Sequence, residues 1–180
     1  MSDEKELKFA VVSDVEELRR RLVEVGAKES SAPSEENNWV FDRHAELYSA
    51  SRLLRLRSDG QGGHLTYKGP PRFEGGLKVR EEIEVDVDDV EATRDLLVRL
   101  GYHVVRRYQK IRQEWRLDST VVAVDLTPIG LFVEFEGEDA PVSAKQCGFD
   151  PEQAEKRSYL RLYEERRREH PHLPPDMVFP

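Results

Sequence analysis

Charged and apolar residues alternate along several stretches of this chain, and this pattern constrains the fold more than any other feature. In the stretch 78–85, Lys78, Arg80, Glu82 and Glu84 occupy every second position. Successive side chains of a strand point to opposite faces, so such a stretch predicts a strand with one charged and one apolar face. The same alternation recurs at 4–9, 54–57, 110–117 and 133–136.

For one strand alone, the simpler interpretation is a half-exposed antiparallel sheet with its charges in water. The pattern recurs in many strands, however, and helices must cover apolar sheet faces somewhere. If helices cover these faces from outside, the charged faces converge inside a curled sheet. About eight strands enclose a space large enough for one small ligand. We therefore expect an α+β fold, in which an antiparallel, closed or nearly closed barrel of about eight strands has a charged interior and helices packed outside.

The remaining elements follow from local periodicity and turn residues. Strands are expected near 4–12, 39–41, 52–58, 64–69, 76–87, 102–117, 120–127 and 131–137. Helices are expected after a capping box at Ser13, after Asp88 or Asp89, after Pro141, and over 158–168. Gly60 to Gly63 predicts a hairpin turn. We expect one domain over 1–168 and an irregular, proline-rich tail over 169–180.

Composition limits the classes of function. The 180 residues carry a formal net charge of −8, which argues against a nucleic-acid-binding surface. The single Cys147 excludes an internal disulfide and fits a reducing compartment. The charged first residues predict no signal peptide, and no apolar run reaches the length of a membrane span. The expectation is a cytoplasmic protein without a membrane or nucleic-acid partner.

The charged faces carry both signs, which suits a polyanion together with a metal. Arginine forks and lysine point charges bind phosphate oxygens. The candidate phosphate-binding residues are Lys8, Arg55, Arg57, Lys68, Arg80, Lys110 and Arg112. Carboxylates are hard oxygen ligands for Mg²⁺ or Mn²⁺. The candidate metal ligands are Glu4, Glu6, Asp125, Glu134 and Glu136. This combination meets the requirements of phosphoryl transfer.

At these residues the sequence resembles the CYTH superfamily, the triphosphate tunnel metalloenzymes. The N-terminal signature E-x-E-x-K is present as Glu4-Lys5-Glu6-Leu7-Lys8. It is followed in order by LRLR at 54–57, TYKGP at 66–70, KVREEIEV at 78–85, QKIRQEW at 109–115, GLFVEFEG at 130–137 and SYLRLY at 158–163. The resemblance spans about residues 4–165 and is greatest to the branch that contains class IV adenylate cyclases and thiamine triphosphatase-like members.

The resemblance implies that Glu4, Glu6, Glu134 and Glu136 bind metal, with Asp125 as a helper, and that the seven bases hold the phosphates. It implies a small-molecule triphosphate as substrate, whether ATP, thiamine triphosphate or tripolyphosphate, and a homodimer. The first expectation is cyclisation of ATP to cyclic AMP and pyrophosphate, with Lys8 as the proton acceptor and Glu6 at the catalytic metal. Neighbouring cations lower the pKa of a lysine and suit it to this role. The alternatives are an inorganic or thiamine triphosphatase and a non-catalytic polyphosphate-binding module.

One departure from the cyclase-like pattern concerns the second strand. Such members often carry Gln and Asp before the aromatic residue, whereas this chain has Glu36, Asn38 and Val40. A cyclase also needs an apolar pocket for the nucleobase of ATP at one mouth of the tunnel. Trp39, Phe41, Leu65 and Tyr67 are the candidates for its walls. His44, His64 and His103 follow no metal-ligand spacing and are interpreted as surface or loop residues.

Overall fold

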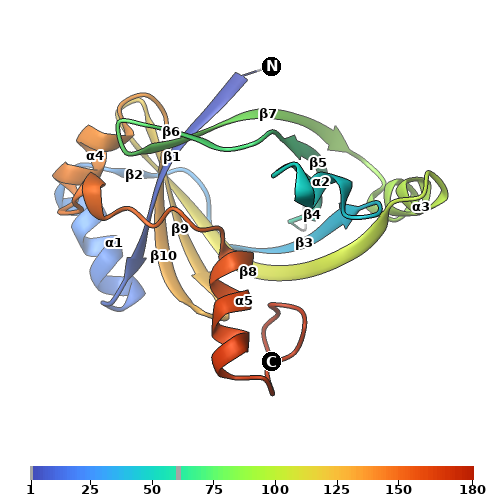
Figure 1. The fold of residues 1–180 in the computed structure, drawn as a ribbon. Coiled ribbons are helices and arrows are strands. Elements are labelled where there is room, and N and C mark those ends of the chain that lie inside the picture. The colour runs from blue at the N-terminus through green and yellow to red at the C-terminus, as the bar shows by residue number, and fades with distance from the viewer. Residues whose placement is uncertain (1, 60–61) are drawn as a thin grey trace.

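The strands close into one antiparallel barrel in the computed structural model, which describes residues 2–59 and 62–180 (Figure 1). Eight strands pair in the order β1, β10, β9, β8, β3, β4, β5, β7, and β7 pairs back with β1 to close the ring. They are β1 Ser2–Val11, β3 Ser34–Asp42, β4 Leu53–Ser58, β5 Gly63–Lys68, β7 Leu77–Val87, β8 His103–Leu117, β9 Thr120–Thr127 and β10 Gly130–Glu136. The short strands β2 Lys28–Glu29 and β6 Arg72–Glu74 add to β8 and β7. The predicted fold class is confirmed. Gly60 and Gln61, half of the predicted hairpin turn, lie outside the described residues.

The helices lie outside the barrel wall or at its rim. They are α1 Val15–Glu24, α2 Glu46–Ser49, α3 Val90–Arg99, α4 Ala140–Gln146 and α5 Tyr159–Glu169, with a 3₁₀ turn η1 at Pro151–Gln153. The predicted capping box at Ser13 is wrong by one residue. Asp14 is the cap, and its carboxylate accepts a hydrogen bond of 2.8 Å from the backbone N–H of Glu17. At α3 the cap is Asp89, whose carboxylate accepts from Ala92 at 2.9 Å.

Two apolar clusters hold helices to the outer face of the wall. Leu18 and Leu22 of α1 are fully buried in a cluster with Leu7, Trp115 and the outward residues of β9 and β10. Burying each leucine contributes about 1.5–3 kcal/mol relative to leaving it exposed. A second cluster joins α3 to the outer side of β3, β4 and β5. Its members are Phe41, Leu56 and Leu97, with Trp39, Leu54, Leu65, Val87, Val90 and Tyr102 packed against them.

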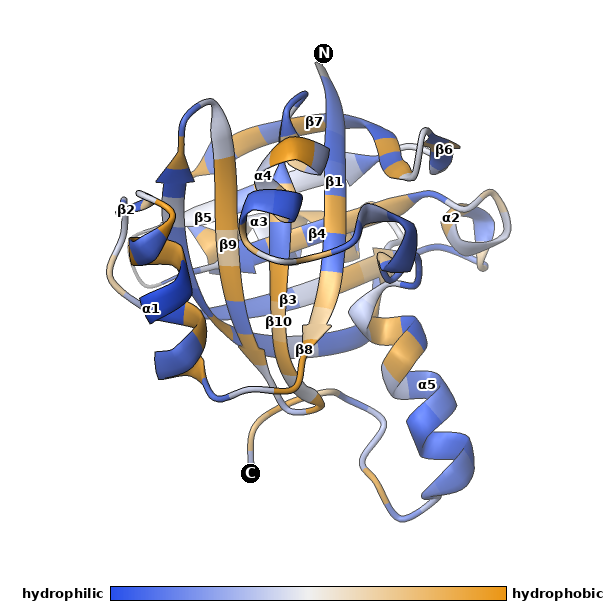
Figure 2. Cartoon of the chain, turned by 90° about the vertical axis from the view of Figure 1, so that its left-hand side faces the viewer, coloured by the Kyte–Doolittle hydropathy of each residue, from blue (hydrophilic) through white to orange (hydrophobic). Residues whose placement is uncertain are grey.

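The alternation read from the sequence is visible along the strands in Figure 2, where hydrophilic and hydrophobic residues follow one another. Most outward apolar residues are covered, but the end of β7 is an exception. Ile83 is 43% exposed and Val85 is 53% exposed. The outer face of β7 therefore has no complete helix cover in the described part of the molecule.

The C-terminal tail is ordered against the barrel. The backbone of Met177 exchanges hydrogen bonds with β8, from Gln109 N–H at 2.8 Å and to Arg107 C=O at 3.0 Å. The Met177 side chain is fully buried in a cluster with Tyr108, Tyr159 and Tyr163. The tail and α5 thus pack against the barrel wall at β8, below the strands in Figure 1.

In the part of the chain that the structure describes, no helix has both the length and the apolar character needed to cross a membrane.

Candidate active site

One cavity of about 340 Å³ runs inside the barrel and is lined almost entirely by charged side chains. We call it the tunnel. Eight basic residues line it, namely Lys8, Arg55, Arg57, Lys68, Lys78, Arg80, Lys110 and Arg112. Seven glutamates line it as well, namely Glu4, Glu6, Glu82, Glu84, Glu114, Glu134 and Glu136. Every phosphate-binding and metal-ligating candidate from the sequence lies on this wall except Asp125.

Strand pairing explains why these residues meet. Glu4 lies opposite Arg80 and Glu6 opposite Lys78 where β1 pairs with β7. On its other edge, β1 places Lys8 opposite Glu134 of β10. Residues opposite each other in an antiparallel pair share a face, so the signature on β1 brings acids and bases of three strands together.

The carboxylates at one side of the tunnel are held by lysines. Lys68 Nζ donates to Glu4 at 2.6 Å and lies 2.9 Å from Glu82. Lys78 Nζ donates to Glu6 at 2.5 Å. Burial raises the pKa of Glu6, but the charges of Lys78 and Lys68 and the hydrogen bond from Lys78 together outweigh it, and the resulting pKa lies below the usual value. Glu6 is therefore ionised at neutral pH.

Arg112 is the centre of the network at the other side. It donates to Asp125 through Nε and Nη2, both at 2.7 Å, and to Glu134 at 2.5 Å. Asp125 is fully buried behind it and also accepts from Lys110 at 3.0 Å and from the Tyr159 hydroxyl at 2.9 Å. Because Asp125 is enclosed by donors and does not line the tunnel, its position favours support of the two bases over contact with a metal.

Burial raises the pKa of Glu136 to about 7, because Arg112 compensates only in part while Glu134, Glu4 and Glu6 add negative potential. The four carboxylates expected to bind metal thus affect one another electrostatically. The negative charge around Glu136 is therefore incompletely neutralised.

The two arginines of β4 that line the tunnel, Arg55 and Arg57, have hydrogen-bond donors without partners among the described residues. Arg55 donates to the Thr66 hydroxyl at 3.2 Å, and Arg57 lies 3.5 Å from both Glu36 and Glu84. The Nε atoms of Arg55 and Arg57 are buried without a hydrogen-bond partner among the described residues. Both amide atoms of the fully buried Asn38, which is opposite Arg57 in register, are likewise unpaired there. Buried donors without partners are costly, so this wall is suited to binding ligand or water oxygens.

Lys8 has surroundings that favour its neutral form. Its side chain is 4% exposed, and its ammonium lies 4.4 Å from the centre of the Tyr159 ring and donates to the Arg157 carbonyl. Burial lowers the pKa of Lys8, and the opposing effect of Glu134 does not cancel this shift. The sequence argument attributed the shift to neighbouring cations; in the structure Lys78 contributes, but burial is the larger cause.

Whether the site fits a divalent metal depends on its carboxylates. In the described ranges no group of three or more Asp, Glu, His or Cys side chains is arranged for metal coordination. The acids are ion-paired with Lys68, Lys78 and Arg112 instead. The carboxylates nevertheless fit a divalent metal ion. Seven glutamates face eight lysines and arginines, which leaves too little net positive charge to hold a triphosphate without a further cation. Glu136 also retains uncompensated negative potential.

Several tunnel residues were not among the candidates from the sequence. Lys78, Glu82, Glu84 and Glu114 fall on the charged faces by alternation, so that signal was available. Tyr108 shares a face of β8 with Lys110 and Arg112, but it carries no charge and was not singled out. Alternation gave no signal for Ser158 and Tyr159, because the docking of α5 on the barrel brings them into place. Glu36 belongs to the network too, at 3.5 Å from both Arg57 and Lys110.

Three of the four residues expected to wall a nucleobase pocket, Trp39, Phe41 and Leu65, belong to the α3 cluster on the outer face. Trp39 and Leu65 pack with the α3 cluster on the outer face and do not line the mouth. Phe41 is the only one of the four candidates that lines a pocket beside the tunnel. On β3, the side chains of Glu36, Asn38 and Val40 point into the barrel. Trp39 and Phe41 alternate with them and therefore point outward, which explains why they join the outer cluster.

Comparison with known proteins agrees with this architecture. The family model described as "CYTH domain" matches residues 2–163. A Methanocaldococcus jannaschii protein named "Putative adenylate cyclase" is 27% identical over 135 residues, which cover 74% of this chain and 77% of that protein.

Two solved structures share the fold. A Vibrio parahaemolyticus protein described as a putative adenylate cyclase superposes with a TM-score of 0.77 at 20% identity, covering 89% of this chain and 97% of its own. A Hippeastrum protein, described as a putative adenylyl cyclase with a dominant triphosphatase activity, gives a TM-score of 0.66 at 17% identity. That match covers 90% of this chain and 95% of the other.

Proposed function

The chain belongs to the CYTH domain family, and on this premise we propose that it is a metal-dependent enzyme that converts ATP to cyclic AMP and pyrophosphate. The observation that carries the proposal is the single tunnel in which eight bases and seven glutamates face one another inside a closed barrel. Its 340 Å³ lies within the range of small-molecule sites, roughly 300–1,000 Å³.

The lysine and arginine side chains of the tunnel would bind the phosphates. Arg55 and Arg57 have buried Nε donors without partners, and Arg112 and Lys110 are held in place by Asp125. Fixed donors of this kind stabilise charge that develops in the transition state without having to reorganise. The phosphate-binding set is Lys8, Arg55, Arg57, Lys68, Arg80, Lys110 and Arg112.

Glu4, Glu6, Glu134 and Glu136 would hold Mg²⁺ or Mn²⁺. A bound divalent ion neutralises phosphate charge and polarises the phosphoryl group. Glu4 and Glu6 would then exchange their ion pairs with Lys68 and Lys78 for the metal, which frees both lysines to contact phosphate.

In the cyclisation the ribose 3′ oxygen forms a bond to the α-phosphorus, and the bond from this phosphorus to the bridging oxygen of pyrophosphate breaks. The 3′ hydroxyl proton passes to Lys8 Nζ. This lysine is suited to accept a proton because burial lowers its pKa. Arg112 and the other bases stabilise the leaving pyrophosphate.

Hydrolysis of inorganic or thiamine triphosphate is the second candidate. The Hippeastrum protein of the same fold supports this candidate, because it is described as a putative adenylyl cyclase with a dominant triphosphatase activity. In this reaction water attacks a terminal phosphorus, and the tunnel needs to hold only the polyphosphate.

Product analysis distinguishes the two. Purified protein is incubated with ATP, thiamine triphosphate or tripolyphosphate in Mg²⁺ or Mn²⁺, and the products are resolved by chromatography. We expect cyclic AMP and pyrophosphate from ATP. Phosphate release from tripolyphosphate without cyclic nucleotide from ATP would assign the protein as a triphosphatase. Binding of all three without any turnover would leave a polyphosphate-binding module.

A further inference from the structure

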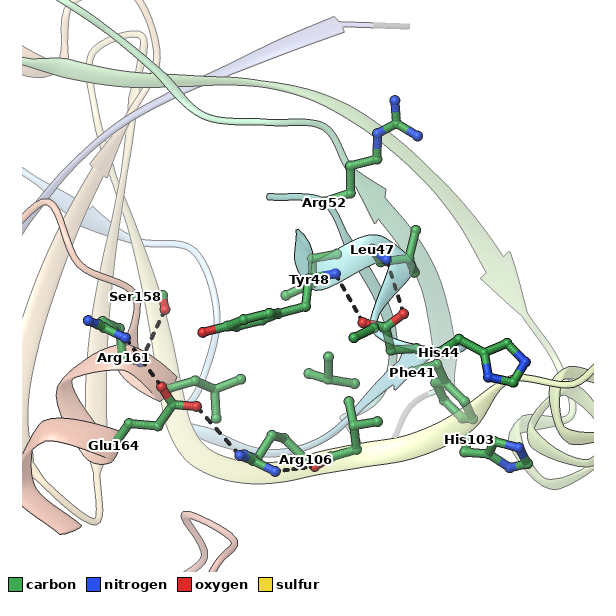
Figure 3. Close-up of a pocket in the computed structure, with 16 residues that line it drawn as sticks. Phe41, His44, Leu47, Tyr48, Arg52, His103, Arg106, Ser158, Arg161 and Glu164 are labelled. Carbon is green, nitrogen blue, oxygen red and sulfur yellow. Dashed lines mark hydrogen bonds and ion pairs between the residues drawn. The ribbon is translucent and has the colours of Figure 1, made fainter. Parts of the chain in front are cut away.

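A second cavity, of about 620 Å³, opens at the end of the barrel where α2 faces α5 (Figure 3). We call it the mouth pocket. Leu53 and Ser158 line both this pocket and the tunnel, so the two spaces adjoin. Its volume is that of a small-molecule site, roughly 300–1,000 Å³, and exceeds that of the tunnel.

The lining of the mouth pocket differs in chemistry from the tunnel. Its walls are mainly apolar and come from five separate elements, β3, α2, β4, β8 and α5, and the segments next to them. The apolar residues include Val40, Phe41, Leu47, Leu53, Val105 and Leu160. A polar edge is formed by Arg106 of β8 and Glu164 of α5, which lie 3.6 Å apart, with Arg161 at 3.7 Å from the same carboxylate. Apolar walls with a few convergent polar groups are typical of sites for organic ligands.

Tyr48 gives this pocket an aromatic surface. Its side chain is 69% exposed, and in Figure 3 its ring extends from α2 across the opening towards Ser158 and Arg161. An aromatic ring that is exposed beside an apolar cavity is a stacking surface, because every planar base can lie on its π-face.

The segment that carries Tyr48 is held rigidly. The Asp42 carboxylate accepts hydrogen bonds from the backbone N–H groups of Arg43 at 2.6 Å and of Leu47 and Tyr48 at 3.0 Å each. Burial raises the pKa of Asp42, but these backbone donors outweigh it, so the pKa falls below the usual value and the carboxylate remains charged. His44 and Ala45 just before α2 have φ of 53° and 60°, an uncommon conformation for residues other than glycine. A strained, tightly bonded loop thus holds the tyrosine over the pocket.

We propose that the mouth pocket binds the organic group of the substrate, a planar aromatic ring stacked on Tyr48, while the phosphates occupy the tunnel. The inference rests on the proposed function and specifies its substrate class as a nucleoside-type triphosphate rather than inorganic tripolyphosphate. The Arg106–Glu164 edge supplies a donor and an acceptor for polar groups at the rim of the ring.

The geometry also bears on which phosphorus reacts. Ser158, which the two cavities share, precedes Tyr159, and Lys8 lies over the Tyr159 ring at 4.4 Å. A ligand with its organic group in the mouth pocket therefore enters the tunnel beside Lys8. The α-phosphate and the ribose, the parts nearest to the organic group, come close to the proposed proton acceptor. This placement favours attack at the α-phosphorus.

Binding of two ligands to three variants tests the proposal. We would titrate the protein by calorimetry with α,β-methylene-ATP, which resists cleavage at the α-phosphorus, and with tripolyphosphate, both with Ca²⁺ in place of Mg²⁺ to slow turnover. The variants are Tyr48→Ala, Tyr48→Phe and Phe73→Ala. Phe73 is a matched control, because it is a half-exposed aromatic residue on β6 that lines neither cavity.

For Tyr48→Ala we expect the dissociation constant of the nucleotide to rise by about fivefold to a hundredfold, the range that loss of a base-stacking ring produces. Tyr48→Phe keeps the ring and should bind the nucleotide within about twofold of the unchanged protein, as should Phe73→Ala. Tripolyphosphate affinity should change by less than about twofold in all three, because its contacts lie in the tunnel.

An unchanged nucleotide affinity in Tyr48→Ala, or an equal loss for nucleotide and tripolyphosphate, would overturn the proposal. If neither ligand binds the unchanged protein, the proposed function itself fails. If tripolyphosphate alone binds, the tunnel assignment stands and the mouth pocket is not a substrate site.

Discussion

Arg112 donates to both carboxylate oxygens of Asp125 at 2.7 Å, and the aspartate is fully buried beneath it. This pair joins β8 to β9 in the floor of the tunnel. Fork-to-fork pairing fixes the plane of the guanidinium and so the direction of its remaining donors. Asp125, which does not itself line the tunnel, therefore orients the Arg112 donors that reach Glu134 and Glu136.

Replacing Asp125 should therefore cost stability. In Asp125→Asn the charges of Arg112 and Lys110 lose their buried partner, and we expect a loss of about 3–5 kcal/mol in the free energy of unfolding. Urea denaturation followed by circular dichroism measures it. Glu91→Gln, which breaks an exposed pair with Arg94 on α3, is the control and should cost less than about 1 kcal/mol. A similarly small loss for Asp125→Asn would contradict the supporting role.

Removing a proposed metal ligand should abolish turnover without unfolding the protein. Glu134→Gln should lower kcat by about a hundredfold or more, because a metal contact in the transition state is worth several kcal/mol. Steady-state kinetics in Mg²⁺ or Mn²⁺, with thermal unfolding of the same samples, separates this effect from instability. Glu138→Gln is the control, since Glu138 pairs with Lys5 and is 78% exposed. Turnover that persists after complete chelation of divalent ions would rule out the metal.

Glu36 should make the free energy of unfolding depend on pH in the acidic range. Burial raises its pKa, but Lys110, Arg112 and Arg57 outweigh this and lower it from 4.5 to about 2. A group with a depressed folded-state pKa stabilises the protein fully above pH 4.5, and this contribution is lost as the pH falls from 4.5 towards 2. The contribution is on the order of 3 kcal/mol at neutral pH.

The measurement is the free energy of unfolding of the unchanged protein and of Glu36→Gln between pH 7 and pH 3. The stability difference between them should be largest and constant from pH 7 to about pH 5, and should shrink at lower pH. A difference that is the same at pH 7 and pH 3 would show that the Glu36 charge does not contribute.

The C-terminal tail should be part of the folded domain. Met177 is fully buried, so Met177→Ala is expected to lower the free energy of unfolding by about 2–5 kcal/mol through the cavity it leaves. Met177→Leu nearly conserves volume and should cost less than about 1.5 kcal/mol. Thermal and urea unfolding of both variants test this. Equal stability of the alanine variant and the unchanged protein would mean that the tail does not contribute to the core.

The charged tunnel could be predicted from the sequence because its signal is local. A strand repeats every two residues, so Lys78 and Arg80, or Glu134 and Glu136, necessarily share a face wherever the strand lies. The apolar faces of the strands must be removed from water, and helices packed outside the barrel bury them. The apolar faces therefore point outward and the charged faces point inward. Fold class, barrel and most of the charged wall follow from that periodicity.

The tertiary structure decided the features that depend on which strands meet and where helices dock. Strand register buried Asp125 behind Arg112 and Lys110, although alternation alone placed it with the other acids. Docking of α5 and the tail brought Tyr159 to Asp125 on β9 and Met177 to β8, from positions far along the chain. The mouth pocket formed between α2 and α5, and only Phe41 of the four residues expected to wall a nucleobase pocket lines it. Such contacts join residues distant in sequence, and their free energy depends on closure of the whole barrel, which no local pattern encodes.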